Sequence, residues 1–170
     1  MGSQTRDGHY WSWECRQDHF CESVIVGEEW DRTVPTVGAN VQKYKKGNLS
    51  LKLWDLGGQV QYRPEWVAYA RTWDMLAFII DSSEPDTVSF CKKELFQLIE
   101  WKDLKNMPLL VLANKIDKEE VLKPTEIVER MNLDYIDDHE WKILPISAKH
   151  GTNMDQAVEW ILKTSNKLKG

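Results

Sequence analysis

Residues 109–117 read LLVLANKID, an unbroken apolar run that ends in a polar cluster. Apolar runs without polar alternation are typical of strands that are covered on both faces of a parallel sheet. The stretches 75–81 (MLAFIID) and 143–147 (ILPIS) have the same character, and shorter strand candidates lie at 41–45 and 51–55. Helical patterns at 87–101, 123–131 and 153–168 alternate with these runs. The alternation predicts an α/β fold with a mostly parallel sheet of about five or six strands, flanked by helices.

Polar residues stand where several of these strands end. Asp55 ends one predicted strand, Asn114 ends another and Ser147 ends a third. In open α/β sheets, ligands bind outside the carboxyl ends of the strands. We therefore expect the binding site at this edge of the sheet.

The cluster after 109–114 is the first candidate for ligand binding. Asn114, Lys115 and Asp117 form the sequence Asn-Lys-Ile-Asp. A carboxylate at Asp117 can accept hydrogen bonds from the N1 and N2 groups of guanine, whereas adenine offers no such pair of donors. A polar loop between a strand and a helix is the alternative interpretation of this motif taken alone.

The second cluster is 55–59, DLGGQ. Paired glycines let the backbone approach a ligand closely and leave an amide free to donate to a phosphate. Asp55 can hold a water bound to Mg²⁺, and Gln59 can orient an attacking water. A simple Gly-Gly turn is the alternative.

Two weaker motifs complete the set. In 33–38 (TVPTVG) a Thr hydroxyl could complete a Mg²⁺ shell, and a loop that contains Pro is the alternative. In Ser147-Ala148-Lys149 a backbone N–H could be presented to the guanine carbonyl. Each motif means little by itself, but all four occur in the order of a small GTPase and each lies at a strand end.

The segment 33–168 resembles the Arf family of small GTPases along nearly its whole length. The most specific matches are WDLGGQ at 54–59 and RPEW at 63–66. The resemblance implies a P-loop NTPase-type fold and a GTP/GDP switch in intracellular vesicle and membrane traffic, with slow hydrolysis. It also implies three groups of site residues: guanine binding by Asn114, Lys115 and Asp117 with Ser147, Ala148 and Lys149; Mg²⁺ binding by Thr36 and Asp55; and γ-phosphate and water contacts by Gly58 and the catalytic Gln59.

The same resemblance implies partners and a location. Exchange factors, GTPase activators and effectors are expected, with a monomeric protein in the cytoplasm that associates peripherally with Golgi or lysosomal membranes. The sequence KGN at 46–48 is similar to a lysosome-associated Arf-like subgroup. Trp54 and Tyr69 match two members of the family's aromatic triad, but Ala39 stands where Phe is usual, which predicts altered effector recognition.

The phosphate-binding loop of the family, Gly-x-x-x-x-Gly-Lys-Thr, does not occur in the sequence. Residues 1–23 contain no apolar run, and we expect them to be a disordered segment ahead of a GTPase domain at 24–170. Because Trp has a single codon, reading one base later would place Gly at Trp11 and Trp13. The same shift over 7–19 permits MVIIGLGNAGKTT, with its Lys at Gln17, which lies 19 residues before Thr36. We hypothesise an out-of-frame first strand and loop.

Loss of the loop leaves a second function class open: a nucleotide-independent interaction protein built on a degenerate GTPase.

Composition and motif spacing argue against several other kinds of partner, site and modification. A net charge of −5 argues against nucleic acid as the main partner. Three cysteines give no disulfide framework, and the spacing of His9, Cys15, His19 and Cys21 does not fit a usual zinc site. Gly2 invites N-myristoylation, but Arg6 stands where that motif needs Ser or Thr.

Overall fold

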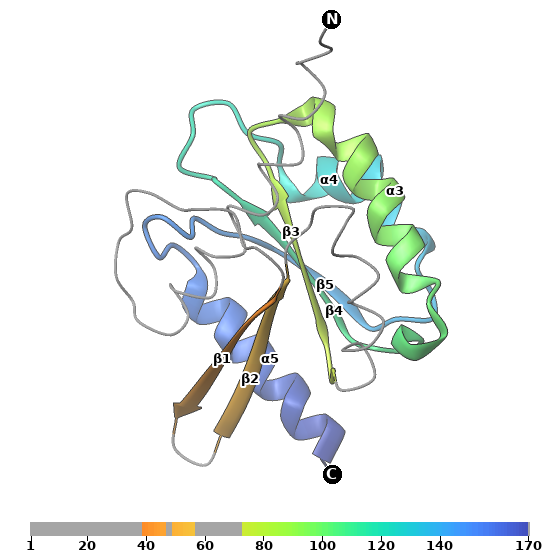
Figure 1. The fold of residues 1–170 in the computed structure, drawn as a ribbon. Coiled ribbons are helices and arrows are strands. Elements are labelled where there is room, and N and C mark those ends of the chain that lie inside the picture. The colour runs from red at the N-terminus through yellow and green to blue at the C-terminus, as the bar shows by residue number, and fades with distance from the viewer. Residues whose placement is uncertain (1–38, 47–48, 57–72, 170) are drawn as a thin grey trace, which may run out of the picture.

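The computed structural model of the chain describes residues 39–46, 49–56 and 73–169. The strands are β1 (Ala39–Lys46), β2 (Leu49–Leu56), β3 (Leu76–Asp81), β4 (Leu109–Asn114) and β5 (Trp141–Pro145). The helices are α3 (Val88–Ile99), α4 (Pro124–Met131) and α5 (Met154–Lys169), with short 3₁₀ turns at η2 (Pro85–Thr87), η3 (Lys102–Leu104) and η4 (Leu133–Tyr135) (Figure 1). All eight predicted strands and helices form, with ends that differ by a few residues.

The strands fall into two sheets. β3, β4 and β5 form a parallel sheet in that order, with Leu76 opposite Leu109 and Leu109 opposite Trp141. β1 and β2 form a separate antiparallel hairpin, in which Ala39 pairs with Leu56. The prediction of strands alternating with helices is confirmed, but within the described ranges the expected single sheet is divided between β2 and β3.

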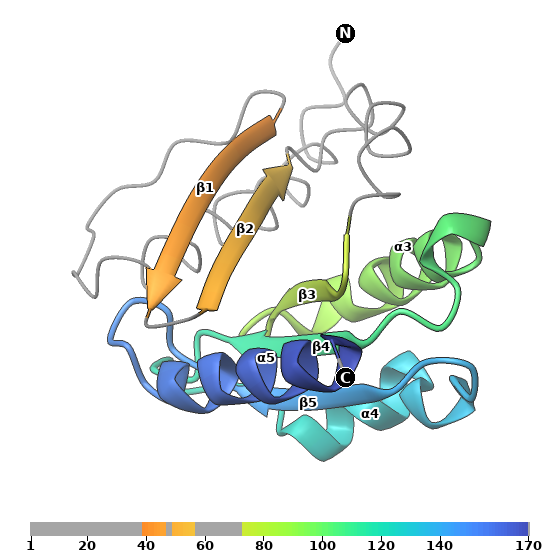
Figure 2. The same ribbon diagram turned by 90° about the horizontal axis from the view of Figure 1, so that it is seen from below.

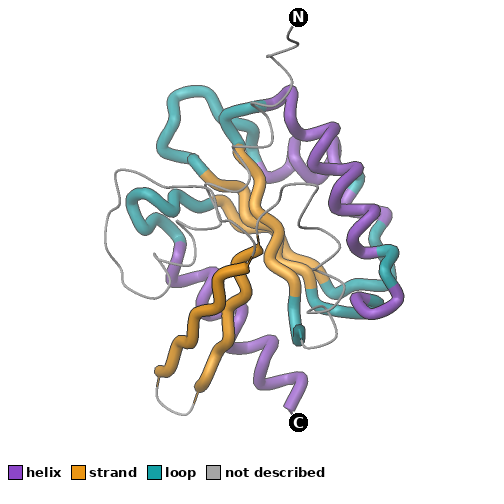
Figure 3. Tube along the Cα trace, viewed as in Figure 1, coloured by secondary structure: helices purple, strands orange, loops and turns teal. Residues whose placement is uncertain are grey.

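Helices cover both faces of the parallel sheet because β4 alternates its side chains between two cores. Leu109, Val111 and Ala113 pack with α3 and α4 on one face. Leu110 and Leu112 pack with α5 on the other. Figure 2 shows α5 on the side of the sheet opposite to α3, and Figure 3 shows the same three layers by element type. Every side chain of β4 is buried, as the apolar run predicted.

The boundaries of β5 correct the predicted strand at 143–147. The strand begins earlier, at Trp141, and ends at Pro145. Ser147 has left the sheet, because its N–H and C=O pair with Thr152 at 3.1 and 3.0 Å in an isolated bridge. Exposed Lys142 interrupts the apolar pattern at the start of the strand, which is why the sequence placed that start too late.

Two predictions fall on residues that the structure does not describe. The proposed disorder of 1–23 and the loss of a first strand both lie outside the described ranges. Among the helices that are described, none combines the length and apolarity that a membrane crossing requires.

Candidate functional site

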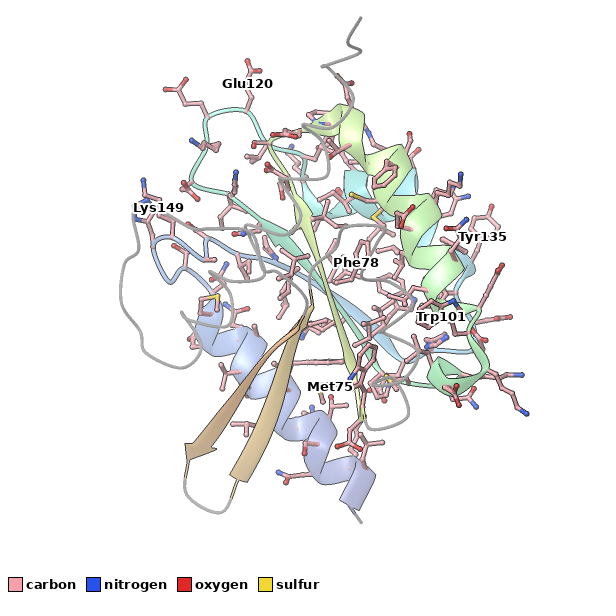
Figure 4. All side chains as sticks on the ribbon, in the orientation of Figure 1. Met75, Phe78, Trp101, Glu120, Tyr135 and Lys149 are labelled. Carbon is pink, nitrogen blue, oxygen red and sulfur yellow. The ribbon has the colours of Figure 1, made fainter. Side chains whose placement is uncertain are left out.

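The candidate site lies at the carboxyl ends of β3 and β4 and in the loop that follows β5. Parallel strands bring these ends to one edge, which is the edge that the sequence predicts. In Figure 4 the label Glu120 marks the loop after β4 and Lys149 marks the loop after β5, while Met75 marks the opposite end of β3. The polar residues of LLVLANKID and of ILPISAK therefore meet in space.

Asn114 fastens the two loops together. It ends β4 with only 3% of its surface exposed. Its Oδ1 accepts the amide of Lys115 at 2.8 Å and the amide of Ala148, 34 residues away, at 3.0 Å. The two bonds occupy the side-chain oxygen and form a clamp that ties the loops after β4 and β5 to each other, while the side-chain NH₂ group is a separate donor.

Lys115 follows in a left-handed backbone conformation with φ of 69°. A side chain other than Gly or Asn rarely adopts this conformation, and it costs about 1 kcal/mol or more. The bond from its amide to Asn114 Oδ1 holds the strained residue in place. Strain of this kind gathers at ligand sites, where the loop must turn sharply.

Asp117 and Ser147 form the second link between the loops. The Ser147 hydroxyl donates to Asp117 Oδ1 at 2.6 Å, and His150 Nε2 lies 4.0 Å from Oδ2. The Asp117 side chain is 18% exposed, so the second oxygen lies at the rim of the site. One oxygen of the carboxylate is oriented by protein, which sets the plane in which the group can accept further donors.

The charge state of Asp117 follows from competing causes. Burial raises the pKa of the Asp117 carboxyl, but the hydrogen bonds from Ser147 and from its own backbone lower it, as do electrostatic interactions with His150 and Lys118. The net effect is a pKa below the ordinary value. Asp117 is therefore ionised near neutral pH and able to accept two N–H donors on a flat ligand edge.

Some of the remaining predicted site residues lie within the described ranges, and others lie outside them. Ala148 is buried at the clamp and Lys149 is exposed beside it. Asp55 lies on β2, opposite Asn40 in the hairpin register. Thr36, Gly58 and Gln59 lie outside the described ranges, so their proposed contacts with Mg²⁺, phosphate and water stay predictions.

The structure adds one residue that the motifs did not reveal. Asp81 ends β3 beside Asn114 in the sheet register and lies with its side chain fully buried, 3.4 Å from Lys115 Nζ. The signal was present in the sequence, because Asp81 follows an apolar strand just as Asn114 does. Among the residues described, no group of three or more His, Cys, Asp or Glu side chains is arranged to hold a metal ion. The four residues weighed as a zinc site lie outside those ranges.

Comparisons with known proteins agree with this geometry. Residues 23–165 match the family model described as "ADP-ribosylation factor family". The chain is 39% identical over 142 residues to ADP-ribosylation factor-like protein 8b of Arabidopsis thaliana, covering 84% of this chain and 77% of that one. It is 36% identical over 143 residues to ADP-ribosylation factor-like protein 8c of the same plant, covering 84% and 78%.

A solved structure resembles the fold as well. It is described as the Arl6 BBS3 small GTPase from Trypanosoma brucei with bound nucleotide analogue GppNp. The TM-score is 0.78 at 25% sequence identity, and the match covers 89% of this chain and 91% of that one.

Proposed function

Because the chain belongs to the ADP-ribosylation factor family, and is thus a small GTPase of the Arf-like type, we propose that its site selects guanine nucleotides and acts as a GTP/GDP switch with slow hydrolysis. The observation that carries the proposal is the double link between the loops after β4 and β5. Asn114 holds the Ala148 amide, and Ser147 orients the Asp117 carboxylate. Together they set an acceptor for the N1 and N2 groups of guanine next to a buried amide.

The phosphate half of the site is proposed from the family resemblance. Thr36 and Asp55 would hold Mg²⁺, the Gly58 amide would meet the γ-phosphate and Gln59 would position the attacking water. Mg²⁺ supplies charge neutralisation between the β- and γ-phosphate oxygens when it is bound. Because the sequence carries no Gly-x-x-x-x-Gly-Lys-Thr, the amides and Lys that cradle phosphates in that motif are missing. We therefore expect weak nucleotide affinity for the chain as it stands.

A second candidate function rests on the same missing loop. Without it the chain would serve as a nucleotide-independent binding surface on a degenerate GTPase. The presence of Gln59, Thr36 and the whole guanine set favours the switch. Nucleotide content of the purified protein separates the two candidates.

The sharpest test of the proposed function is a change of base preference. Xanthine carries an oxygen where guanine carries its N2 amine, so an amide donor suits xanthine as a carboxylate suits guanine. Asp117→Asn should weaken GDP binding at least about tenfold and favour XDP, because a charge-assisted pair is lost. Binding is measured by competition against a fluorescent guanine nucleotide. Equal affinity of the unchanged chain for GDP and ADP would argue for the interaction protein.

Asp134→Asn is the matched control. Asp134 is an exposed acid on η4, so its substitution makes the same change of charge away from the site. GDP affinity should stay the same in this variant. A similar loss in both variants would mean that overall charge, not the Asp117 carboxylate, sets the binding.

The reading frame has its own test. Sequencing the transcript across codons 5 to 25 shows whether a one-base shift restores the phosphate loop. A restored loop would make the native protein an ordinary Arf-like switch, and an intact frame would move the interaction protein forward.

Partners and location are proposed at the family level. Exchange factors, GTPase activators and effectors would act on the switch in vesicle and membrane traffic. The chain would be cytoplasmic and would associate peripherally with Golgi or lysosomal membranes. Imaging of the tagged chain against markers of both organelles tests the location.

A further inference from the structure

Asp81 is a buried carboxylate that the proposed site does not yet explain. Its side chain has 0% exposure, and it lies at the last position of β3. Oδ1 accepts the Ser83 amide at 2.9 Å and the Ser83 hydroxyl at 2.7 Å. Oδ2 lies 3.4 Å from the ammonium of Lys115. One oxygen therefore shapes the turn after β3, while the other faces a cation from the loop after β4.

The turn itself does not require a charge. A neutral amide such as Asn offers an oxygen that could accept both Ser83 donors. Burying a carboxylate is costly unless a positive group and hydrogen bonds compensate for the lost water. The structure places the Lys115 ammonium 3.4 Å from Asp81 Oδ2, and this pair gives the carboxylate a role beyond shaping the turn.

Lys115 is consequently fixed at both ends. Its amide donates to Asn114 Oδ1 at 2.8 Å, and its backbone has a φ of 69°. Its ammonium lies 3.4 Å from Asp81 Oδ2, while 37% of the side chain remains exposed. The four methylene groups must run between these two anchors, which makes them a fixed apolar surface instead of a mobile chain.

The neighbouring backbone keeps the two anchors together. The Ser82 amide donates to the Asn114 carbonyl at 2.9 Å, and the Leu122 amide donates to the Ser82 carbonyl at 2.8 Å. Asp81 and Asn114 are also paired in the β3–β4 register. The distance between the Asp81 carboxylate and the Lys115 backbone is thus set by the sheet.

We propose that Asp81 is a positioning residue for the purine base, which anchors the Lys115 ammonium so that the Lys115 stem forms one wall of the guanine pocket. The proposal deepens the proposed function and rests on it. A flat aromatic base gains from packing on an ordered aliphatic and cationic side chain, and it gains less when that chain must first be ordered.

The test begins with Asp81→Asn in the full chain, which keeps an oxygen for Ser83 and removes the charge. GDP is the probe for binding, and guanosine is the probe for the base half alone. We expect the affinity for both to fall about tenfold, within the range of coupling energies between contacting residues. Asp134→Asn on η4 is the charge-matched control and should change neither affinity. Unchanged affinities in Asp81→Asn would overturn the proposal.

A double-mutant cycle shows whether Asp81 acts through Lys115. Lys115→Met keeps most of the stem and removes the ammonium. If Asp81 works by anchoring that ammonium, Asp81→Asn should cause no further loss of affinity in a Lys115→Met background. If the losses of affinity in the two single variants instead add up in the double variant, Asp81 acts independently of Lys115. Its role would then be confined to the turn after β3, and the proposal would be overturned.

A measurement without nucleotide separates this proposal from the proposed function. Lysine ammonium groups are labelled by reductive ¹³C-methylation, and the Lys115 signal is assigned with the Lys115→Met variant. The signal should stand apart from those of exposed lysines in the unchanged chain and should join them in Asp81→Asn. That result with no detectable GDP or guanosine binding would support the anchoring and reject the guanine switch. A Lys115 signal indifferent to Asp81 would reject the anchoring.

Discussion

At the scale of single residues, the site is a set of polar side chains that are oriented by hydrogen bonds within the protein. Asn114 uses its carbonyl oxygen on two amides, and Ser147 both donates to Asp117 and accepts the His150 amide at 3.3 Å. Prior orientation of this kind lowers the entropy that a ligand would otherwise have to supply. The loops after β4 and β5 are thus arranged for binding by contacts within the protein.

The Asn114 clamp can be tested through stability. Asn114→Ala leaves the Lys115 and Ala148 amides without their acceptor at a buried position. We expect the free energy of unfolding to fall by about 1–3 kcal/mol. Urea denaturation followed by circular dichroism measures the change. Asn166→Ala, on the exposed side of α5, is the control and should stay within about 0.5 kcal/mol of the unchanged chain.

The lowered pKa of Asp117 predicts a pH dependence. Its carboxylate is stabilised in the folded state, so its contribution to stability is complete at pH values well above the ordinary value of 3.8 and disappears as the pH falls through the lower folded value. Ser147→Ala removes the hydroxyl donor and should raise the pKa of Asp117. Urea denaturation at neutral and acidic pH should therefore show that this variant loses more stability at neutral pH than at acidic pH. An equal loss at both values would contradict the hydrogen bond's role.

At the scale of elements, β3 has the buried apolar side chains that are typical of a strand with neighbours on both sides. Phe78, Ile79 and Ile80 are 1%, 2% and 0% exposed, although β3 pairs only with β4 within the described ranges. Strands at the edge of a sheet usually carry charges or are very short, whereas β3 is apolar on both faces. Its composition fits a fold in which a further strand lies next to it.

Packing of β3 against the helices should dominate its contribution to stability. Ile80 is fully buried in the core that α3 and α4 share. Ile80→Ala should lower the free energy of unfolding by about 2–5 kcal/mol, through lost transfer energy and a residual cavity. Leu168, which is 52% exposed on α5, is the control. If Leu168→Ala cost as much as Ile80→Ala in urea denaturation, the assignment of the core would be wrong.

At the scale of the whole molecule, a shifted reading frame would explain both the division of the described strands into two sheets and the missing phosphate loop. A parallel strand between β2 and β3 would join the hairpin to the three-stranded sheet, and the loop after that strand would reach the edge where the guanine residues lie. The reading MVIIGLGNAGKTT over 7–19 supplies both features in the correct order. The hypothesis of a shifted reading frame and the arrangement of the described strands therefore both concern residues 7–19.

Restoring that segment is the corresponding prediction. A chain in which 7–19 is replaced by MVIIGLGNAGKTT should melt at least about 8 °C higher than the present one, because a buried strand adds several kcal/mol. It should also be purified with bound guanine nucleotide. Differential scanning calorimetry and nucleotide analysis measure the two effects. A melting temperature above about 60 °C with tight GTP binding in the unmodified chain would contradict this account.

A scrambled insert provides the control for the restored chain. The same thirteen residues of 7–19 replaced by a shuffled MVIIGLGNAGKTT change the composition equally but break both the apolar run and the phosphate motif. Its melting temperature and nucleotide content should match those of the unmodified chain. A gain in the shuffled chain would attribute the effect to composition.

The sequence by itself determined the α/β class, the strands at 75–81 and 109–114, the three helices and the edge of the parallel sheet at which Asn114 and Ser147 lie. Apolar runs and helical periodicity are local properties, so they survive without knowledge of the fold. Tertiary structure alone decided which distant groups meet: the Ala148 amide on Asn114, the Ser147 hydroxyl on Asp117 and the Lys115 ammonium beside Asp81. It also placed the end of β5 at Pro145 and, among the strands that the structure describes, put the hairpin and the parallel strands into two sheets. Pairings of this kind depend on how the strands are ordered in space, and that order is set by long-range packing rather than by any local pattern.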